Sequence, residues 1–485
     1  MTSWQTLANA ECLGQDQVPF LPPEDFFASV DEHLRSTRVV AYFARPDETG
    51  HELTAVFADD AENRLFTART LITGNQIPSL SSQHPQLQRY ERELAEAGLV
   101  SDPTLTHLRR PPLPGDPEQF HPLPGEEVHE VAVGPVHAGV IEPGHFRFQC
   151  RGETVYRLEI ALGYQHRGLE AAWEGGPHPR TLHYAETLAG DTTLAHMTAY
   201  ARILEALAGT RVPLRAEALR ALGLELERLA NHVGDLGALA GDTGYLPTAS
   251  FCGRIRGDFL NLTALVCGNR FGRGWVIPGG VAFDLDQPRV AELQKRLESL
   301  TRETSQAINL LWTTSSVLAR MEHIGPLSRE QAQTLGLVGP AARACGLVRD
   351  VRFDQPTGFY RFQQIPVSTY DTGDVFSRAY VRWLEIQKSL AFLHDLLKNL
   401  PSGALSAPVG ELKPNHLAVA LEEAWRGEAA HVAWTSPDGK LARYKVVDPS
   451  FHNWTALEWA LKGQEISDFP LCNKSFNLSY CGHDL

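Results

Sequence analysis

The sequence predicts an α+β protein in which a small N-terminal α+β domain is followed by a mainly α-helical bundle domain with peripheral β-hairpins. Three observations support this fold class. Segments rich in β-branched and aromatic residues gather between residues 38 and 72. Six prolines stand between Pro111 and Pro124, and proline at that density prevents both helix and sheet. Beyond them, four long segments repeat apolar residues every three or four positions, which is typical of helices in a bundle.

The composition is that of an ordinary globular protein. The chain has 485 residues, which is enough for two or more domains, and it is 43% hydrophobic and 21% charged. A net charge of -14 argues against nucleic-acid binding, which needs a basic face. No apolar run approaches the ~18 residues of a membrane span, and residues 1–17 do not suggest a signal peptide. Membrane association is therefore expected through a partner.

The cysteines indicate a reducing compartment and no metal site of their own. None of the seven forms a C-x-x-C pair, so neither a disulfide framework nor a thiolate-bound metal or iron–sulfur cluster is expected in this chain. They are Cys12, Cys150, Cys252, Cys267, Cys345, Cys472 and Cys481.

The first domain is expected to span residues 1–110, and a semi-rigid linker residues 111–127. Helices are expected at residues 24–36 and 87–97, the second ending before Gly98. Strands are expected at residues 38–44, 53–58 and 64–72.

The second domain, residues 128–485, is expected to begin with strands and to continue as helices. The strands are expected at residues 128–133, 145–150 and 154–162, with a turn around Gly152. A hairpin is expected from residues 431–435 and 441–447 around the turn sequence SPDG. The four amphipathic segments expected to form the bundle are residues 197–207, 222–236, 290–300 and 386–400.

Three polar clusters near the start of the second domain mark the candidate site. One begins at a strand, one follows a strand end, and one begins a helix, which are places where a fold presents reactive groups without burying unpaired backbone. The clusters are GPVHAGVIEPGHFRF (134–148), YQHRGLE (164–170) and ETLAGDTTLAH (186–196).

These motifs resemble the large subunit of energy-converting, membrane-bound [NiFe] hydrogenases of the formate hydrogenlyase and hydrogenase-4 type. They resemble the hydrogenase-like (forty-nine-kilodalton) subunit of respiratory complex I more distantly. In the first domain, YERELAEAGL (90–99) and HLRR (107–110) resemble the end of the thirty-kilodalton subunit of complex I, so the chain looks like a fusion of the two modules. Later segments agree, namely WVIPGGV (275–281), GDVFSRAYVRWLEIQKSL (373–390), EAWRGE (423–428) and DFPLCNKSFNLSY (468–480).

The sequence departs from the hydrogenases at the metal ligands. In that family two C-x-x-C pairs hold nickel and iron, because soft thiolates bind these metals strongly. The resemblance places the four cysteines at Ala189, Thr192, Ser479 and Gly482, while Cys481 is one residue out of register. The sequence also stops at Leu485, without the tail that hydrogenase maturation removes. Nickel is therefore not expected. The resemblance instead indicates a nickel-free branch of the family.

The resemblance implies that complex I uses the corresponding cavity for a quinone. Only some of its quinone-binding residues have a counterpart in this sequence. Its first-hairpin histidine corresponds to His137, with His145 as a competitor. Its tyrosine falls near Gly190 and is absent. The chain also has no G-x-G-x-x-G turn for a dinucleotide, so any NAD association belongs to the whole complex.

Each candidate site residue has a structural alternative. His137 is assigned as catalytic and quinone-binding, because imidazole titrates near physiological pH, or else it pins its loop to the hairpin. Glu170 resembles the family's proton-relay carboxylate and is assigned as catalytic, or else it pairs with Arg167. His166 in the same HRGLE motif is assigned to cofactor binding.

Asp191 and His196 complete the candidate set. Asp191 is assigned as catalytic, because it is the one charged residue where metal ligands would stand; the alternative is an acid favoured by a helix N-terminus. His196 is assigned to cofactor binding, against a packed core histidine. The C-terminal residues Ser479, Cys481, His483 and Asp484 are interpreted as a docked polar tail.

The leading hypothesis is a redox subunit of a complex-I-like membrane-bound oxidoreductase. It implies a partner like the twenty-kilodalton iron–sulfur subunit of complex I with a [4Fe–4S] cluster, a quinone or another small acceptor, and membrane antiporter-like and proton-channel-like subunits. The expected location is the cytoplasmic face of a bacterial plasma membrane. The alternative is a non-catalytic scaffold that links the iron–sulfur subunit to the membrane arm. An active [NiFe] hydrogenase is the least favoured hypothesis, because Ala189 and Gly482 offer no donor atom.

Overall fold

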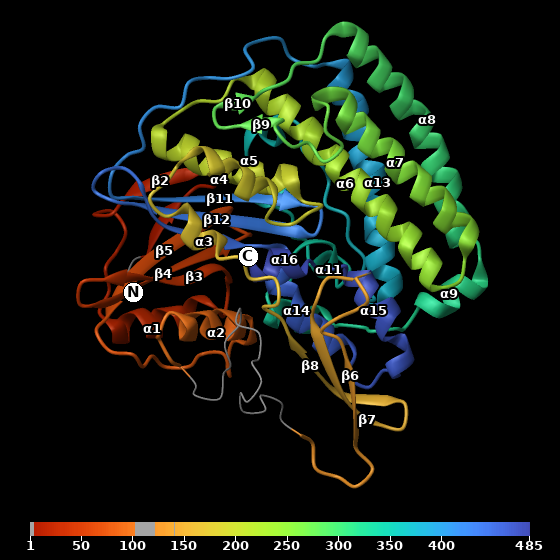
Figure 1. Ribbon diagram of the computed structural model, residues 1–485, viewed down its shortest axis with the longest axis horizontal. Helices are drawn as coiled ribbons and strands as arrows, with labels where there is room; N and C mark the ends of the chain where they lie inside the picture. The colour runs from red at the N-terminus through yellow and green to blue at the C-terminus, as the bar shows by residue number, and fades with distance from the viewer. Residues whose placement is uncertain (1–3, 102–121, 140) are drawn as a thin grey trace.

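A four-stranded antiparallel sheet near the C-terminus is the centre of the molecule. The computed structural model describes residues 4–101, 122–139 and 141–485 (Figure 1). The central sheet has the order β13-β12-β11-β2. Its strands are β2 (Glu11–Gly14), β11 (His416–Ala424), β12 (Gly427–Thr435) and β13 (Leu441–Val447). One strand of the sheet therefore comes from the N-terminal region and three from the C-terminal region.

Both faces of the central sheet are buried. Along β11, Leu417, Val419 and Leu421 face the N-terminal core, while Ala418 and Ala420 face the core of the helical part. This side-chain alternation has a period of two, as a strand requires. The small alanines allow helix α5 (Thr193–Ala208) to lie close against the sheet. A strand buried on both faces is a continuous apolar run, which is why the sequence alone did not identify β11.

The N-terminal part forms a second sheet with two covering helices. Its strand order is β1-β5-β4-β3, and all neighbours are antiparallel. The expected helices and strands between residues 24 and 97 are confirmed. The elements are β1 (Gln5–Leu7), α1 (Pro23–His33), β3 (Arg38–Asp47), β4 (Gly50–Asp59), β5 (Arg64–Ile72), the 3-10 turn η1 (Pro85–Leu87) and α2 (Gln88–Glu96).

The N-terminal and C-terminal parts share one hydrophobic core. Trp434 and Phe451 from the C-terminal part are buried among N-terminal side chains such as Phe57 and Tyr90. The Trp434 indole also donates a hydrogen bond to Thr54 at 3.2 Å. The division at residue 110 and most of the linker at 111–127 fall on residues outside the described ranges, so that boundary stays a prediction.

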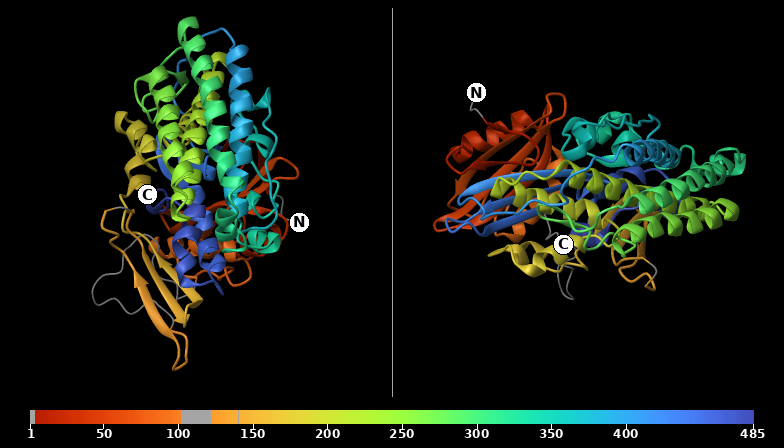
Figure 2. Two further views of the ribbon diagram at one scale, coloured as in Figure 1. Left: turned by 90° about the vertical axis from the view of Figure 1, so that its right-hand side faces the viewer. Right: turned by 90° about the horizontal axis from the view of Figure 1, so that it is seen from above.

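The helical bundle consists of α6, α7, α8 and α13, and both views in Figure 2 show it extending away from the N-terminal sheet. Three of the four expected bundle segments lie in α6, α8 and α13. The assignment of residues 197–207 to the bundle is wrong, because α5 packs on the central sheet and α7 takes that place. Gly253 and Gly257 weaken the helical pattern of α7. The bounds are α6 (Leu214–Asp242), α7 (Leu246–Cys267), α8 (Gln287–Trp312) and α13 (Val375–Lys398).

A three-stranded sheet of order β6-β7-β8 projects beside the C-terminal helices, and the expected hairpin of β12 and β13 is confirmed. Within the described residues no helix is both long and apolar enough to cross a membrane. The remaining elements are β6 (His129–Val133), β7 (His145–Arg151), β8 (Thr154–Ala161), α3 (Leu169–Trp173), α4 (Pro179–Glu186), β9 (Val276–Ile277), β10 (Gly280–Val281), α9 (Ser315–Met321), α10 (Arg329–Thr334), α11 (Gly339–Arg343), α12 (Val351–Asp354), η2 (Gly358–Arg361), α14 (Pro449–Ala460), η3 (Ile466–Asp468), α15 (Phe469–Phe476) and α16 (Tyr480–Asp484).

Candidate functional site

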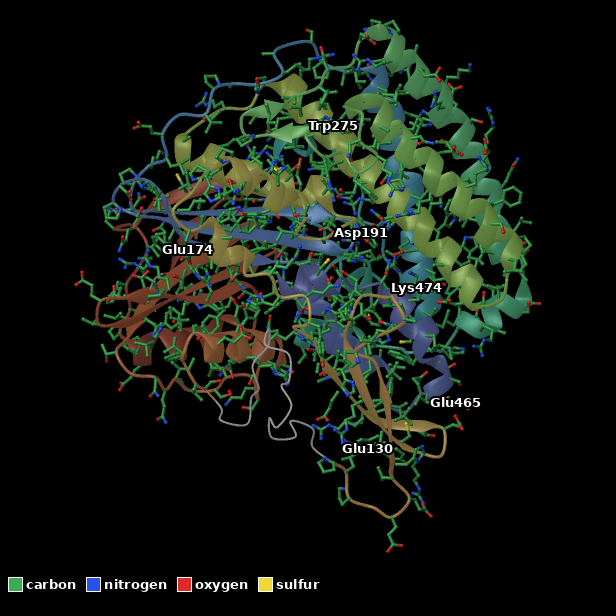
Figure 3. The ribbon with its side chains drawn as sticks, in the orientation of Figure 1. Glu130, Glu174, Asp191, Trp275, Glu465 and Lys474 are labelled. Carbon is green, nitrogen blue, oxygen red and sulfur yellow. The ribbon has the colours of Figure 1, made fainter. Side chains whose placement is uncertain are left out.

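The tip of the β11–β12 hairpin carries an arginine that pairs with Asp191. Arg426 donates from its two terminal nitrogens to the two carboxylate oxygens of Asp191, at 2.6 and 2.9 Å. The guanidinium also lies 3.9 Å from the ring centroid of Trp425. Asp191 itself lies just before α5, at the end of the hairpin (Figure 3). The bidentate geometry fixes both side chains.

Both members of this pair are charged. Burial by itself raises the pKa of Asp191, but the charge and hydrogen bonds of Arg426 outweigh it, so the pKa lies below its ordinary value. The pKa of Arg426 is raised, because the attraction of Asp191 exceeds the effect of burial. Asp191 was expected to be catalytic or a helix N-terminal acid, and the geometry adds a third role, which is to hold the hairpin tip.

The four positions that the resemblance assigns to metal-binding cysteines lie on the two segments that Arg426 joins, since it bonds to Asp191 and to the carbonyl of Asn477. Ala189 and Thr192 precede α5, and Ser479 and Gly482 lie at α16. Thr192 Oγ1 accepts hydrogen bonds from the Trp425 indole at 3.1 Å and from Arg426 at 3.3 Å. Ser479 Oγ accepts the backbone N–H of Gly482 at 2.9 Å and caps α16. The two hydroxyls therefore serve the local backbone and the arginine.

A nickel–iron pair does not fit these residues. Ala189 and Gly482 carry no donor atom, and a Cβ atom added at Gly482 would lie 2.7 Å from the carboxylate carbon of Asp448. The space that a cysteine side chain would enter from position 482 is thus occupied by the Asp448 carboxylate. No catalytic step through such a metal pair is derived for this chain.

Glu142 also belongs to this site. It reaches from the loop after β6 to the start of α16, where it accepts the backbone N–H groups of Tyr480 at 3.2 Å and Cys481 at 3.4 Å. Burial, together with the negative charge of Glu142, raises the pKa of the Cys481 thiol to about 11. Cys481 is therefore a protonated thiol at neutral pH. Glu142 lies within the first sequence cluster, but nothing in the sequence distinguished it from its neighbours.

His137 lies in the same loop and bonds to its backbone. Its Nε2 is 2.9 Å from the carbonyl oxygen of Gly144, and its ring centroid is 6.0 Å from that of Phe146. Nδ1 of His145 is 3.2 Å from the carbonyl oxygen of Gly134. Both histidines thus close the loop onto the hairpin, as the structural alternative required. The catalytic role of His137 stays a prediction.

His166 and Arg167 hold the C-terminal residues. Nδ1 of His166 is 2.9 Å from the carbonyl oxygen of Asp484. The side chain of Arg167 donates to the carbonyl groups of Thr187, Leu188 and Cys481. Ser479, His483 and Asp484 are buried, so the docked tail is confirmed. The cofactor-binding role of His166 stays a prediction.

Glu170 lies in an ion cluster between α3, β13 and α2. Its carboxylate is 3.2 Å from Lys445 Nζ and 3.3 Å from an Arg443 nitrogen, and it accepts the backbone N–H of Val446 at 3.0 Å. Lys445 also pairs with Glu93 at 2.6 Å. Glu170 therefore helps to join the N-terminal and C-terminal parts, and its role in proton transfer stays a prediction.

His196 is fully buried and uses both ring nitrogens. Nε2 lies 3.0 Å from Asp448 Oδ2, and Nδ1 lies 3.1 Å from Nε2 of His431. Asp448 also acts electrostatically on Asp191 and Arg426. Asp448 therefore bonds to His196 and lies close enough to Asp191 to act on it electrostatically. The prediction that His196 binds a cofactor is not tested by this arrangement.

A narrow cleft of about 10 Å³, which is room for about one water molecule, opens beside Asp191. Glu227 lies in it and accepts the backbone N–H groups of Leu194 and Ala195 at the start of α5. Burial raises the pKa of Glu227 to about 8, although these two hydrogen bonds lower it. A carboxyl group that is protonated at neutral pH and faces a cleft is a candidate proton donor. The cleft is lined by Asp191, Leu194, Glu227, Asn231, Leu260, Thr263, Arg270 and Phe271.

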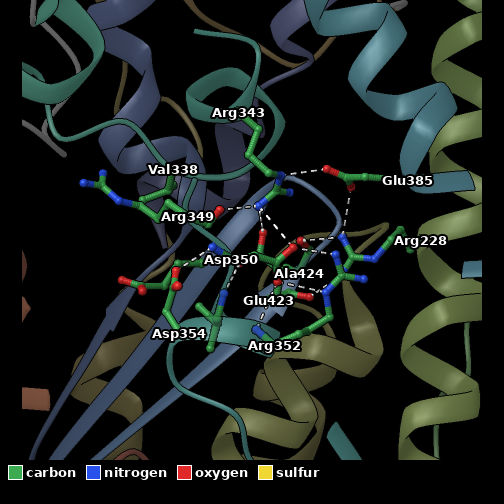
Figure 4. Close-up of polar contacts among 12 residues, drawn as sticks. Arg228, Val338, Arg343, Arg349, Asp350, Arg352, Asp354, Glu385, Glu423 and Ala424 are labelled. Carbon is green, nitrogen blue, oxygen red and sulfur yellow. Dashed lines mark hydrogen bonds and ion pairs between the residues drawn. The ribbon is translucent and has the colours of Figure 1, made fainter. Parts of the chain in front are cut away.

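A second buried polar cluster lies behind the hairpin, and we call it the ionic network (Figure 4). Arg343 is its centre, 2.8 Å from Glu385, 2.8 Å from Glu423 and 3.4 Å from Asp350. Glu385 also lies 2.8 Å from His232 Nε2. The members of the ionic network are Glu225, Arg228, Arg343, Asp350, Arg352, Glu385 and Glu423.

Comparison with known proteins places this architecture in a family. Residues 242–413 match the model of the respiratory-chain NADH dehydrogenase 49 Kd subunit. Formate hydrogenlyase subunit 5 of Escherichia coli is 30% identical over 445 residues, covering 86% of this chain and 78% of that protein. The carbon monoxide-induced hydrogenase of Rhodospirillum rubrum is 32% identical over 354 residues, covering 72% of this chain and 97% of that protein. This chain belongs to the family that unites the hydrogenase-like subunit of complex I with the large subunits of energy-converting hydrogenases.

The solved structures agree with this assignment at the level of the fold. A chain of the membrane-bound sulfane sulfur reductase, an archaeal respiratory membrane complex, superposes with a TM-score of 0.70 and 24% sequence identity. It covers 75% of this chain and 100% of that chain. The large-subunit fold is therefore shared by complexes with different substrates, so the function of this family member depends on its own site residues.

Proposed function

We propose that this chain is a nickel-free redox subunit of a complex-I-like, membrane-bound oxidoreductase. Electrons would arrive from a [4Fe–4S] cluster in a partner like the small iron–sulfur subunit of complex I and pass to a quinone or another small acceptor. Membrane antiporter-like and proton-channel-like subunits would complete the assembly on the cytoplasmic face of the membrane. Family membership and the named relatives support an oxidoreductase complex of this kind.

One observation carries the proposal: the Asp448 carboxylate occupies the space next to Gly482, where the hydrogenases would place a cysteine. The neighbouring Arg426–Asp191 pair adds a fixed positive charge and its counter-charge at the same place. A metal pair held by thiolates is replaced by a hydrogen-bonded polar site. Such a site suits an organic acceptor whose oxygen atoms gain charge on reduction, because a fixed guanidinium stabilises that charge.

Reduction of a quinone to a quinol consumes two electrons and two protons. The electrons would come from the partner's cluster, and the protons would pass through groups of this chain. Glu227 is suited to supply one of them, because its carboxyl group is protonated at neutral pH and faces the cleft beside Asp191. The cleft has a volume of about 10 Å³, which is room for about one water molecule, so the acceptor headgroup would lie outside it and only the proton would pass through it.

Electrochemical reduction of the native complex in the presence of a short-chain quinone tests this proposal. Arg426→Met removes the fixed charge and should slow quinone reduction by roughly 10-fold or more. The matched control is Arg254→Met, because Arg254 is 50% exposed and pairs with Asp258 and Glu303 on the surface. Unchanged reduction in the assembled Arg426→Met complex would reject the proposed acceptor site.

A scaffold without chemistry is the second candidate, and one observation favours it. The polar groups of Arg426 and Asp191 already satisfy each other, and His137, His166 and Glu170 all take part in structural contacts. A scaffold predicts that Glu170→Gln leaves the electron-transfer activity of the assembled complex intact. A clear loss of activity with normal assembly would reject it.

A further inference from the structure

A polar cleft of about 480 Å³ lies where the N-terminal part of the chain meets α10. Segments 34–38, 58–61 and 83–86 of the N-terminal part line it, together with segments 329–334 and 347–349 of the C-terminal part. None of these segments belongs to the site at the hairpin tip. The volume is within the range of small-molecule sites, so the cleft is large enough for a ligand of its own.

Two arginines in this cleft share one carboxylate. Arg38 donates from Nε to Asp60 Oδ2 at 2.9 Å, and Arg349 donates from its own Nε to the same oxygen at 2.9 Å. Arg38 has a second carboxylate partner, because Glu428 accepts from its Nη1 at 2.6 Å. Asp60 is the one carboxylate that Arg349 pairs with among the described residues. The positive charges of the two arginines are therefore balanced unequally.

The guanidinium of Arg349 leaves one terminal nitrogen unused. Nη1 donates to the carbonyl of Leu337 at 2.6 Å and Nε to Asp60, and within the described part of the chain Nη2 has no acceptor. The group points away from the ionic network (Figure 4). Burial and the charge of Arg38 lower the pKa of Arg349 in spite of the attraction of Asp60 and Glu428. Since a guanidinium keeps its proton, this positive charge is not fully balanced.

Two further guanidinium groups line the cleft from opposite parts of the chain. Arg329 on α10 is exposed and forms no ion pair in the described ranges. Arg35, just after α1, is 70% exposed and pairs only with Asp31 of its own helix, at 2.6 Å. Guanidinium groups bind phosphate and carboxylate through paired hydrogen bonds. An anion in the cleft would therefore find such groups on both sides of the seam.

The acidic groups of the cleft are largely used within the protein. Asp60 is paired with two arginines, and Asp59 accepts the backbone N–H groups of Ala61 and Glu62 at 3.0 and 3.2 Å. Glu330, next to Arg329 on α10, is exposed and has no ion pair in the part of the chain that the structure describes. It is thus the one acidic group of the cleft that would oppose an anion without a compensating partner.

The remaining polar groups of the cleft are amides and hydroxyls. Four of these side chains make no hydrogen bond to any described residue, namely Ser36, Gln83, Gln333 and Thr334. Amides and hydroxyls both donate and accept hydrogen bonds, so they suit the hydroxyl groups of a ligand. Charged groups at one place and neutral polar groups around them are the pattern expected for a small organic anion.

We propose that this cleft binds a small organic anion, with Arg329 and Arg349 on its phosphate or carboxylate group and the amides and hydroxyls on a hydroxyl-bearing body. Sugar phosphates and hydroxy acids share this chemistry. The site does not depend on the electron transfer proposed above. Because its walls come from both parts of the chain, the bound anion holds the N-terminal part against α10.

Isothermal titration calorimetry of the native complex tests the site with ribose 5-phosphate, citrate and inorganic phosphate at matched ionic strength. We expect ribose 5-phosphate or citrate to bind at one molecule per chain, and more tightly than inorganic phosphate. Ribose 5-phosphate alone would identify a phosphate ester as the ligand, and citrate alone a hydroxy acid. Absence of binding by all three probes at millimolar concentration would overturn the site. Equal affinity for inorganic phosphate would overturn the recognition of a hydroxyl-bearing body.

Two neighbouring substitutions with opposite effects locate the binding. Arg329→Gln should weaken binding of the tighter probe by roughly 10-fold, and Glu330→Gln should tighten it by roughly 2- to 5-fold. Both side chains are exposed, so both variants should assemble. Arg349→Gln should act like Arg329→Gln. Arg254→Gln makes the same charge change on the surface of the bundle and should leave binding unchanged. Unchanged binding in Arg329→Gln, or an equal loss in Arg254→Gln, would overturn the cleft as the site.

Discussion

The site at the hairpin tip and the ionic network behind it are both buried and both rich in charge, but they treat charge differently. In the ionic network each arginine faces several carboxylates: Arg343 contacts Glu385, Glu423 and Asp350 (Figure 4). At the hairpin tip Arg426 has one carboxylate, that of Asp191. Asp448 lies close by and bonds to His196 instead of to an arginine.

This difference shows how the groups around a buried carboxylate set its pKa. Guanidinium groups never lose their proton in proteins, so a carboxylate that faces two of them is fixed. Glu385 is such a carboxylate, and its pKa lies well below its ordinary value. At the hairpin tip Asp448 bonds to His196 and to the backbone of Ser450, and among the described residues none of its ion pairs is with an arginine. We therefore expect the ionic network to determine stability and the tip to determine chemistry.

The largest expected effect is the loss of the central arginine of the ionic network. Arg343→Met leaves three buried carboxylates without a common partner and should lower the free energy of unfolding by about 3–5 kcal/mol. Arg254→Met, at a half-exposed surface pair, should cost about 0–1 kcal/mol. Thermal unfolding of the purified complexes measures both. Equal costs would contradict the assignment of stability to the ionic network.

The pH dependence of the ionic network should be the next largest effect. Among the paired groups, three guanidinium groups face four carboxylates, and Glu423 has a pKa of about 7 because burial and Asp350 raise it. Since the native state binds the extra proton, its stabilising effect is present below about pH 4.5 and is lost as pH rises through about 7.

Glu423→Gln should remove this part of the pH dependence, amounting to a few kcal/mol between about pH 5 and about pH 8. Thermal unfolding measured across that range checks the prediction. Asp354→Asn should remove a separate loss of the same sign, because burial raises the pKa of Asp354, which lies outside the three-arginine cluster, to about 7. A pH profile identical to wild type in Glu423→Gln would show that Glu423 is already ionised at low pH.

Introducing a cysteine at position 482 in α16 should have a smaller but specific cost. The new side chain of Gly482→Cys meets the Asp448 carboxylate at 2.7 Å, so the substitution should destabilise the protein by about 1–3 kcal/mol. Gly257→Cys in α7, where no heavy atom lies within 4 Å of an added Cβ, should cost nothing. Adding Asp448→Ala should make the double variant less destabilised than the sum of the singles. Strict additivity would mean that Asp448 does not fill that space.

The smallest expected effect is at the loop histidine. His137→Ala removes the bond to the Gly144 carbonyl and should lower the free energy of unfolding by about 0.5–1.5 kcal/mol. Thermal unfolding of the complex measures this, with Ala138→Gly in the same loop as a reference for backbone effects. A cost near zero would show that the loop is held by other contacts.

The sequence predicted those elements whose pattern is local. The strands between residues 38 and 72 and the hairpin of β12 and β13 are rich in β-branched residues and bounded by polar turns, and they were found where expected. Helix α7 was missed because two glycines interrupt its pattern. Strand β11 was missed because burial on both faces removes the alternation that identifies a strand.

The candidate site could be predicted from the sequence only where the resemblance aligned its residues with the motifs of the family. The motif around Asp191 and the four positions without cysteine could be placed in this way. The pairing of Asp191 with Arg426 could not, because the two residues are 235 positions apart. The same holds for Glu142, Glu227 and Asp448, whose partners come from distant elements. Contacts of this kind depend on the assembled fold, and no local sequence pattern predicts them.

The most direct test of the central claim is the metal content of the purified native complex. Nickel and iron are measured per chain by elemental analysis, with the wild-type complex beside Gly482→Cys. The account predicts iron, which the partner's cluster would supply, and no nickel in either complex, because Ala189 still offers no donor and Asp448 occupies the neighbouring space. Nickel near one atom per chain in the wild-type complex would contradict the account and would indicate that the chain is an active [NiFe] hydrogenase subunit.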